Sequence, residues 1–283
     1  MVGRAARQQG GRRRDKQIVR TATGRALVFT MDGPEGEPVR VLQQGGVFQS
    51  ATYLDERRFE PVFAYYRGFD ALFEAEPELR RAVGHGVRRV ALLGGGGFSY
   101  PKHLLTAHEG IALDVVELDA SVVRLARRWF FLDELEARLA RPELARGNSL
   151  RIDIASARAY LETVGPREGP YDAIINDTFV GAEPARSLAT LEAARAVRRC
   201  LGPGGLYLVN AVSRGGGSDL GFLRDEVATL LQVFARVHVL DASDERFGGE
   251  SNYLLIATDG AARFAGAIAY DEDFPGRPLR DAH

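Results

Sequence analysis

Seven short runs rich in valine, isoleucine and leucine constrain the fold of this chain more than any other feature. They are Arg88–Gly94, Leu113–Leu118, Leu150–Ile154, Asp172–Asp177, Gly205–Asn210, Ala235–Leu240 and Ser251–Thr258. Segments with apolar residues at helical spacing separate the first five runs. Because neighbouring parallel strands need a crossover connection, this alternation predicts a mostly parallel, doubly wound α/β sheet with helices on both faces.

The last two runs are joined by a polar loop without a helical pattern, so we expect them to pair antiparallel. A seven-stranded Rossmann-like sheet that ends in such a pair is typical of nucleoside-binding transferases of the class I methyltransferase type. A dinucleotide dehydrogenase would need a second full set of strands and helices. We assign this Rossmann-like domain to residues 58–260, followed by a C-terminal tail at 261–283.

The N-terminal part has a different pattern. Between residues 17 and 57, short alternating runs are broken by Gly- and Pro-containing turns, which predicts a small domain of β-hairpins. The first sixteen residues carry five arginines, one lysine and three glycines with almost no apolar side chain. This composition predicts a disordered basic arm over residues 1–16.

Four consecutive glycines, Gly94 to Gly97, follow the first apolar run and precede a helical pattern. Glycine allows a sharp turn and lets backbone N–H groups approach a ligand at the helix N-terminus. Glu117 ends the next run, 23 residues after Gly94, about the spacing at which a carboxylate accepts both hydroxyls of a ribose. Together they predict an adenosine-type ligand. Ser99 stands where the dinucleotide fingerprint has its third glycine, which argues against NAD.

Asp177 closes the fourth run, and a loop containing Gly and Pro follows it. Ligands of such sheets bind outside the carboxyl ends of the strands, so we expect Asp177 to face the cleft. A helix cap or a hydrogen bond within the loop is the alternative for this residue. Asp119 is interpreted as the N-cap of the helix that follows it.

These motifs occur in a familiar order. "LGGGG", "VVELD" and "YDAIINDTFVGAEPARSL", behind a β-rich segment containing "GGVFQS", resemble the polyamine aminopropyltransferases, the family of spermidine synthase, over about residues 17–259. The chain is identified as a divergent member of that family. The resemblance implies a small N-terminal β domain, a methyltransferase-like Rossmann domain, a homodimer and decarboxylated S-adenosylmethionine as donor.

The resemblance also implies roles for individual residues. Asp177 matches the base and binding group for the incoming amine. Tyr66 matches an aromatic near that substrate, although it also belongs to an apolar stripe whose helical spacing predicts one helix over residues 59–73, formed by Val62, Tyr66, Phe69 and Phe73. Glu117 matches the acid that holds the donor's ribose, and Gln49 matches a glutamine near the donor. The predicted site comprises Asp177 as catalytic residue, Tyr66 and Asp177 for the substrate, no metal, and for the donor Gln49, Gly94, Gly95, Gly96, Gly97, Glu117 and Ser156.

Three aspartates of the family's pattern are missing. Gly97 stands where an aspartate pairs with the donor's aminopropyl ammonium, Val180 lies near the second aspartate of the post-strand motif, and Ser156 replaces the aspartate that touches the adenine. Losing a buried charge partner typically costs a few kcal/mol, so weak binding of a polycation is expected. With Gly97 in place of an acid, the carboxylate of intact S-adenosylmethionine would meet backbone N–H groups instead of a like charge.

From this argument we predict an enzyme, a spermidine synthase-like transferase that uses an S-adenosylmethionine-type donor and moves an alkyl group, with methyl favoured, to an amine or another small nucleophile. The first alternative is a true aminopropyltransferase that makes spermidine from putrescine and decarboxylated S-adenosylmethionine. A non-catalytic nucleoside-binding sensor or scaffold is the alternative of another class, and an NAD-dependent oxidoreductase is a third.

Charge and composition narrow the partners and the compartment. The 37 basic and 38 acidic residues nearly cancel, so a nucleic-acid partner would have to depend on the N-terminal arginines alone, and we do not expect one. No apolar run approaches the roughly 20 residues that span a bilayer, and one cysteine, Cys200, cannot form an internal disulfide. We therefore predict a cytoplasmic protein without a membrane partner.

Overall fold

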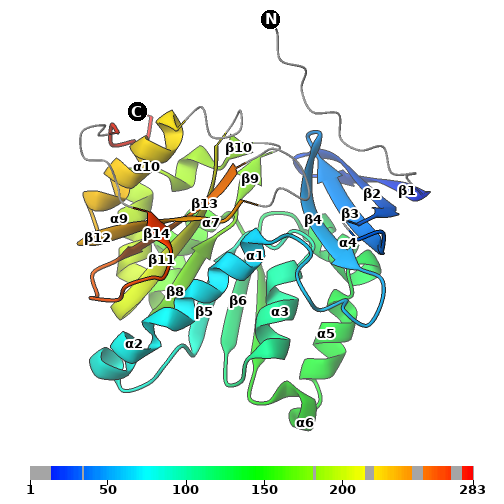
Figure 1. Cartoon of the computed structure of the whole chain (residues 1–283), viewed down its shortest axis with the longest axis horizontal. Coiled ribbons are helices and arrows are strands. Elements are labelled where there is room, and N and C mark those ends of the chain that lie inside the picture. The colour runs from blue at the N-terminus through cyan, green and yellow to red at the C-terminus, as the bar shows by residue number, and fades with distance from the viewer. Residues whose placement is uncertain are drawn as a thin grey trace, which may run out of the picture.

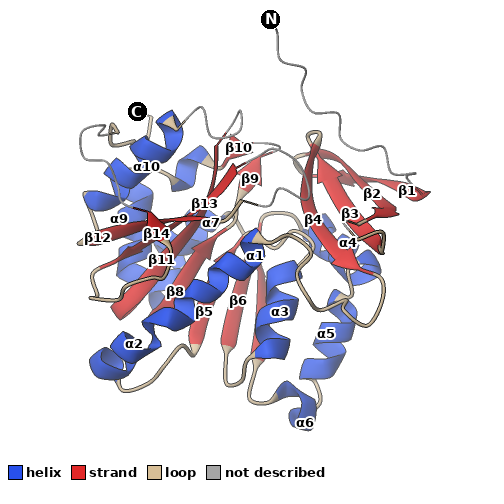
Figure 2. Cartoon of the chain, viewed as in Figure 1, coloured by secondary structure: helices blue, strands red, loops and turns tan. Residues whose placement is uncertain are grey.

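A computed structural model describes residues 14–33, 35–180, 183–213, 220–243, 251–268 and 276–282. Its centre is a sheet in the order β14-β12-β13-β11-β8-β5-β6-β7, with helices on both faces (Figures 1 and 2). The strands are β5 (Arg89–Leu93), β6 (Ala112–Glu117), β7 (Ser149–Ile154), β8 (Tyr171–Asn176), β11 (Leu201–Ser213), β12 (Arg236–Asp241), β13 (Ser251–Thr258) and β14 (Ala267–Ile268).

The strand pairing follows the sequence pattern. The strands β7, β6, β5, β8 and β11 pair parallel, whereas β13 pairs antiparallel with both β11 and β12. This confirms the doubly wound sheet with an antiparallel end. The structure adds one strand to the seven expected, because the two-residue β14 pairs with β12 at the sheet edge. A strand of only two residues, with no helix leading into it, is too short to show a periodic pattern in the sequence.

Alternating side chains of the sheet build a separate core on each face. Leu92 and Ile175 belong to the core that also holds the N-terminal strands and the helices α1 to α5, whereas Leu93 and Ile174 belong to the core beneath α7 to α10. Successive side chains of a strand point to opposite faces, so a sheet covered on both sides needs apolar residues at every position. This requirement explains the continuous apolar runs.

Helices and short 3-10 segments connect the strands. Along the first half of the Rossmann-like domain lie α1 (Tyr65–Gly68), η1 (Phe69–Ala75), α2 (Glu76–Val83), α3 (Ser99–Ala107), α4 (Ala120–Trp129), α5 (Leu132–Leu139) and α6 (Pro142–Ala145). Along the second half lie α7 (Ala157–Thr163), α8 (Gly165–Glu168), the two-residue strands β9 (Phe179–Val180) and β10 (Glu183–Pro184), η2 (Arg186–Leu188), α9 (Leu191–Cys200) and α10 (Gly221–Leu231).

Two boundaries differ from the sequence-based expectation. The apolar stripe from residue 59 to 73 predicts one helix, yet helical structure begins only at Tyr65, after Pro61, and continues as the 3-10 segment η1. The first N-terminal strand begins at Arg14, inside the predicted basic arm of residues 1–16, because backbone pairing with β2 requires no apolar side chain. The rest of that arm, residues 1–13, lies outside the described residues.

The N-terminal strands form a separate antiparallel sheet, β1 (Arg14–Thr21), β2 (Gly24–Asp32), β3 (Pro38–Gln44) and β4 (Val47–Tyr53). Lys102 of α3 is fully buried beside this sheet and donates hydrogen bonds of 2.8 Å to Thr52 Oγ1 and to the Arg58 carbonyl. Burial lowers the pKa of Lys102 to about 7. The contact joins the small domain to the first helix after the glycine turn.

The described part of the C-terminal segment is held against the Rossmann-like domain. The Leu279 carbonyl accepts a hydrogen bond of 2.9 Å from the Leu191 amide, and Asp281 forms an ion pair of 2.7 Å with Arg158. Among the helices in the described ranges, none is long and apolar enough to span a membrane.

Candidate functional site

The glycine turn lies directly against the end of β8. Gly94 and Gly96 adopt positive φ angles of 94° and 50°, which only glycine takes up at little cost. A Cβ on Gly94 would collide with the backbone oxygen of Asp177. The structure therefore brings the predicted donor loop and the predicted catalytic residue together at the carboxyl edge of the sheet.

Glu117 is bound to this turn through its side chain. One carboxylate oxygen accepts hydrogen bonds from the amides of Gly95 at 2.9 Å and Gly96 at 3.2 Å, and the other accepts from the Asp119 amide at 3.0 Å. The carboxylate is buried. Three backbone donors thus fix its position beside the glycines, where a ligand with hydroxyl groups can be recognised. Asp119 caps α4 through a hydrogen bond from the Ser121 amide, as predicted.

Asp177 lies in an environment that has few charges. It accepts a hydrogen bond of 2.8 Å from the side-chain amide of Asn210 and a longer one of 3.5 Å from the Tyr65 hydroxyl. No cationic side chain of the described residues forms an ion pair with it. Loss of hydration raises the pKa of Asp177 to about 6, and the two hydrogen bonds oppose that rise only in part. This carboxylate is therefore ionised at neutral pH, and it is a stronger base than an exposed aspartate.

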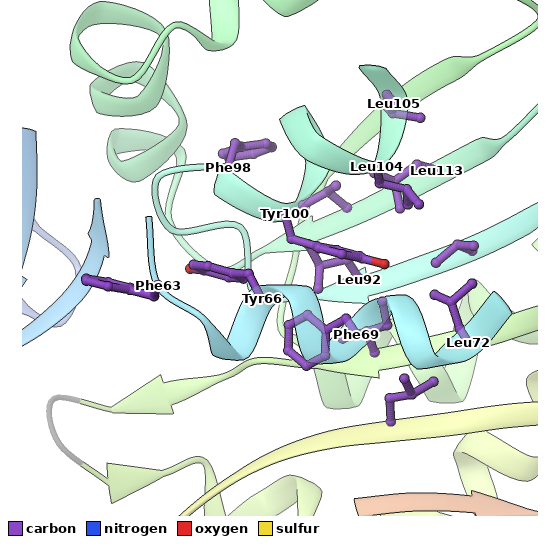
Figure 3. Close-up of a cluster of buried hydrophobic side chains, with 14 of the residues drawn as sticks. Phe63, Tyr66, Phe69, Leu72, Leu92, Phe98, Tyr100, Leu104, Leu105 and Leu113 are labelled. Carbon is purple, nitrogen blue, oxygen red and sulfur yellow. The ribbon is translucent and has the colours of Figure 1, made fainter. Parts of the chain in front are cut away.

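Tyr65 and Tyr66, the first two residues of α1, lie next to Asp177. Their ring centroids lie 4.2 Å apart, and burial is the main cause that raises the pKa of both hydroxyls. Tyr65, and not the predicted Tyr66, reaches the Asp177 carboxylate. The Tyr66 hydroxyl lies 3.5 Å from both the Gln49 carbonyl and Ser50 Oγ, and its ring lies in the hydrophobic core (Figure 3). Its role as a substrate contact stays a prediction.

The N-terminal sheet packs directly against the glycine turn. The Ser99 hydroxyl donates to the Ala51 carbonyl at 2.9 Å, and it therefore accepts the 2.9 Å hydrogen bond that joins it to the Ser50 hydroxyl. A Cβ on Gly97 would lie 2.6 Å from Ser50 Oγ and 2.9 Å from a ring carbon of Phe130. In this packing, position 97 has no room for a side chain.

The remaining predicted residues lie around this centre. The Gln49 carbonyl is 4.0 Å from where a Cβ on Gly96 would be, which places the first half of β4 beside the turn. Ser156 is the N-cap residue of α7 and makes no capping hydrogen bond through its side chain. The side chain of Val180 and residues 181–182 lie outside the described residues, so the position of the missing second aspartate is not described.

Two residues of the site were not predicted from the sequence. Asn210 is the last residue of the apolar run Gly205–Asn210, just as Asp177 is the last residue of its own run. The rule that ligands bind at the carboxyl ends of such strands therefore also points to Asn210. Tyr65 gives no such indication, because its neighbour Tyr66 has the same chemistry. Which of the two reaches Asp177 depends on where α1 begins.

No protein-family model matches the chain. Among curated proteins, the polyamine aminopropyltransferase of Vibrio vulnificus is 26% identical over 173 residues, which cover 60% of this chain and 50% of that protein. The polyamine aminopropyltransferase of Nitrosomonas europaea is 32% identical over 150 residues, 51% of this chain and 42% of that protein. The chain thus matches about half the length of these relatives.

Solved structures are similar over more of the chain. A probable spermidine synthase from Corynebacterium glutamicum superposes with a TM-score of 0.65 at 25% identity, covering 86% of this chain and 80% of that one. Human methyltransferase-like protein 13 in complex with SAH gives 0.50 at 21% identity, covering 73% and 85%, respectively, which concerns the fold alone. The fold is thus of the class I methyltransferase type, with a small N-terminal antiparallel β domain. Within that class the chain fits the spermidine synthase-like proteins, which confirms the resemblance seen in its motifs.

Proposed function

We propose that this protein is an enzyme that transfers an aminopropyl group from decarboxylated S-adenosylmethionine to an amine. The environment of Asp177 is the observation that carries the proposal. A carboxylate beside an aromatic pair and two neutral hydrogen-bond donors attracts a cation, and none of the described side chains supplies one. The relatives named as aminopropyltransferases support the same choice over the methyl transfer predicted from the sequence.

In this reaction the amine nitrogen attacks the aminopropyl carbon bonded to the sulfonium sulfur. A C–N bond forms, the C–S bond breaks, and its electron pair stays on sulfur as a neutral thioether. The incoming amine is protonated in water, so a base must first take a proton from it. Asp177, with a pKa of about 6, can accept that proton and pass it to water. Once ionised again, it stabilises the positive charge that develops on nitrogen.

The glycine turn and Glu117 suit the donor's nucleoside. The Glu117 carboxylate is already held by the Gly95 and Gly96 amides, so no side chain has to reorder before a ribose binds. An in-line displacement of a good leaving group needs mainly alignment of the two substrates. Fixing the donor at the end of β6 and the amine at the end of β8 supplies that alignment, because these ends lie on the same edge of one sheet.

Methyl transfer from intact S-adenosylmethionine is the second candidate, and one observation favours it. The packing of Ser50 and Phe130 around Gly97 excludes the acid that would pair with an aminopropyl ammonium. The carboxylate of the intact donor would meet backbone N–H groups there instead of a like charge. The two reactions differ in the thioether that they release, which makes them directly distinguishable.

The deciding experiment incubates the purified protein with each donor and putrescine, and identifies the products by mass spectrometry. Aminopropyl transfer releases methylthioadenosine and makes spermidine. We expect these products when putrescine is combined with the decarboxylated donor, and not when it is combined with the intact donor. Release of S-adenosylhomocysteine with the intact donor would overturn the proposal in favour of methyl transfer. Calorimetric binding of either donor without any product, in assays with other amines as well, would indicate a nucleoside sensor.

We propose further that the protein is a homodimer that acts in the cytoplasm on small amines, without a nucleic-acid partner. These expectations follow from the similarity to the spermidine synthase-like proteins and from the near balance of charges. Light scattering of the purified chain tests the dimer. A mass equal to one chain at all accessible concentrations would contradict it.

A further inference from the structure

Outside the candidate site, three potential metal ligands come together between η1 and α3. Asp70, His103 and His108 each offer one ligand atom, and these atoms all lie within 4.8 Å of one another. His103 Nε2 already contacts Asp70 Oδ2 at 2.7 Å. The histidines are five positions apart, which is not the spacing of a shared helical site, but His108 follows the end of α3 and its ring turns back toward His103.

Neighbouring aromatic residues hold two of these ligands in place. The Tyr100 hydroxyl donates a hydrogen bond of 3.2 Å to Asp70 Oδ1, which leaves Oδ2 directed toward His103. The Phe73 ring stacks on the His108 ring with centroids 3.8 Å apart and an angle of 17° between the planes. Ligands fixed by a second layer of contacts lose less freedom when a metal binds, which is why such contacts raise metal affinity.

We propose that Asp70, His103 and His108 form a binding site for a divalent transition metal of the zinc class. Two imidazoles and one carboxylate suit Zn²⁺, Co²⁺ or Fe²⁺ better than Mg²⁺ or Ca²⁺, which prefer oxygen ligands. Tetrahedral bonds of about 2.1 Å place ligand atoms about 3.4 Å apart, so small side-chain rotations suffice.

The site is separate from the proposed reaction centre. In Figure 3 the hydroxyl of Tyr100 points away from that of Tyr66, so the Asp70 carboxylate and the Gln49 carbonyl that they contact lie in opposite directions. A metal at Asp70 would join η1, which continues from the helix of Tyr65, to α3, which begins at the glycine turn. Its expected role is to hold these two elements together, with the remaining coordination position open to water because all three ligands are partly exposed.

The test titrates the full-length, tag-free protein, first freed of metal by a chelator, with ZnCl₂ and with CoCl₂. We expect one Zn²⁺ per chain by calorimetry, a rise of the unfolding temperature on binding, and a visible Co²⁺ spectrum of mixed nitrogen and oxygen ligation. The variants His103→Ala and His108→Phe should lose this binding, and His108→Phe retains an aromatic ring to stack on Phe73. His85→Ala, a partly exposed histidine outside the cluster, is the matched control and should bind as the wild type does.

A smaller effect is expected from Tyr100→Phe, which removes only the hydrogen bond to Asp70 and should weaken Zn²⁺ binding by about tenfold. Circular dichroism of each metal-free variant shows whether it folds. Absence of stoichiometric Zn²⁺ binding by the folded wild type, or equal binding by wild type and His103→Ala, would overturn the proposal. Because Zn²⁺ binding is measured without donor or amine, its outcome is independent of the transfer assay.

Discussion

Strands β6 and β8 each have one acidic residue toward the amino end and another at the carboxyl end. The groups that surround these acids differ between the two edges of the sheet. Asp114 and Asp172 lie toward the amino ends, where arginine side chains or backbone amides surround them. Glu117 and Asp177 lie at the carboxyl ends, where the described residues give them no cationic partner. The same residue types thus serve stability at one edge and are available for ligands at the other.

At the amino edge, hydrogen bonds and ion pairs hold both Asp114 and Asp172. Asp114 Oδ2 accepts a hydrogen bond of 2.6 Å from the Tyr171 hydroxyl and forms an ion pair of 3.1 Å with Arg151. Tyr160 lies 2.7 Å from the Tyr171 hydroxyl and accepts from Arg151 as well. Asp172 accepts from the backbone amides of residues 88 and 89. Buried acids are tolerated when they are paired and hydrogen-bonded in this way.

At the carboxyl edge, Asp177 is incompletely compensated. It has two neutral donors, one of them at 3.5 Å, and no cationic partner among the described residues, whereas Glu117 accepts from three backbone amides. A group whose ionised form is poorly stabilised in the folded protein gains from a ligand that brings the missing charge. This contrast supports the proposal that a cationic donor and an amine bind at the carboxyl edge, and the following predictions test it.

The largest expected effect is loss of transfer activity in Asp177→Asn. The substitution keeps the size and the hydrogen-bonding capacity of the side chain but removes the base, so kcat should fall by about 10²–10⁴-fold. Steady-state assays with both substrates measure this change. Asp172→Asn, at the other end of the same strand, is the matched control and should retain kcat once the folded fraction is taken into account. Equal losses in the two variants would contradict the assignment of Asp177.

A stability effect is expected at the amino edge. Asp114→Asn removes the charge that faces Arg151 and weakens the acceptor for Tyr171, so unfolding should become easier by about 2–4 kcal/mol. Urea denaturation measures this difference. Glu168→Gln alters a more exposed partner of the same arginine, 2.8 Å away, and should change stability by less than about 1 kcal/mol. A smaller loss in Asp114→Asn than in Glu168→Gln would show that the network is not structural.

Much of this arrangement is predictable from the sequence. The apolar runs specify the sheet and its antiparallel end, since a doubly covered strand needs apolar residues at every position. The rule for parallel sheets places Asp177 and the glycines at one edge. The sequence does not show that Tyr65 contacts the acid, because this depends on the start of α1 after Pro61. Nor does it bring Asp70 to His103 and His108, which depends on how η1 packs on α3.

Gly97 illustrates the limit of residue-by-residue comparison. The sequence shows that an acid is missing there, but only the packing shows that Ser50 and Phe130 fill the space that a side chain would need. Position 97 is therefore packed against both the N-terminal sheet and the C-cap residue of α4. Restoring an aspartate by a single substitution would require those neighbours to move, a cost that no local motif records.

The smallest expected effect is on stability against unfolding. Removing an acid should raise stability at the carboxyl edge and lower it at the amino edge, so this effect tests the contrast most directly. Burial raises the pKa of Asp177 from its usual 3.8 to about 6, so the folded protein binds a proton more tightly than the unfolded chain does. Its ionisation therefore lowers stability progressively as the pH rises from about 4 to 6, by about 1–3 kcal/mol in total, and no further above that range.

Asp177→Asn removes this cost. At pH 7.5 the variant should be more stable than the wild type, whereas at pH 4 the two should be nearly equal. Urea denaturation of both proteins at the two pH values measures the difference, with Asp114→Asn as the variant that loses stability at pH 7.5. If Asp177→Asn destabilises the protein at pH 7.5 as Asp114→Asn does, the acid at the carboxyl edge is as well compensated as the one at the amino edge, and the proposed cation site at Asp177 loses its physical basis.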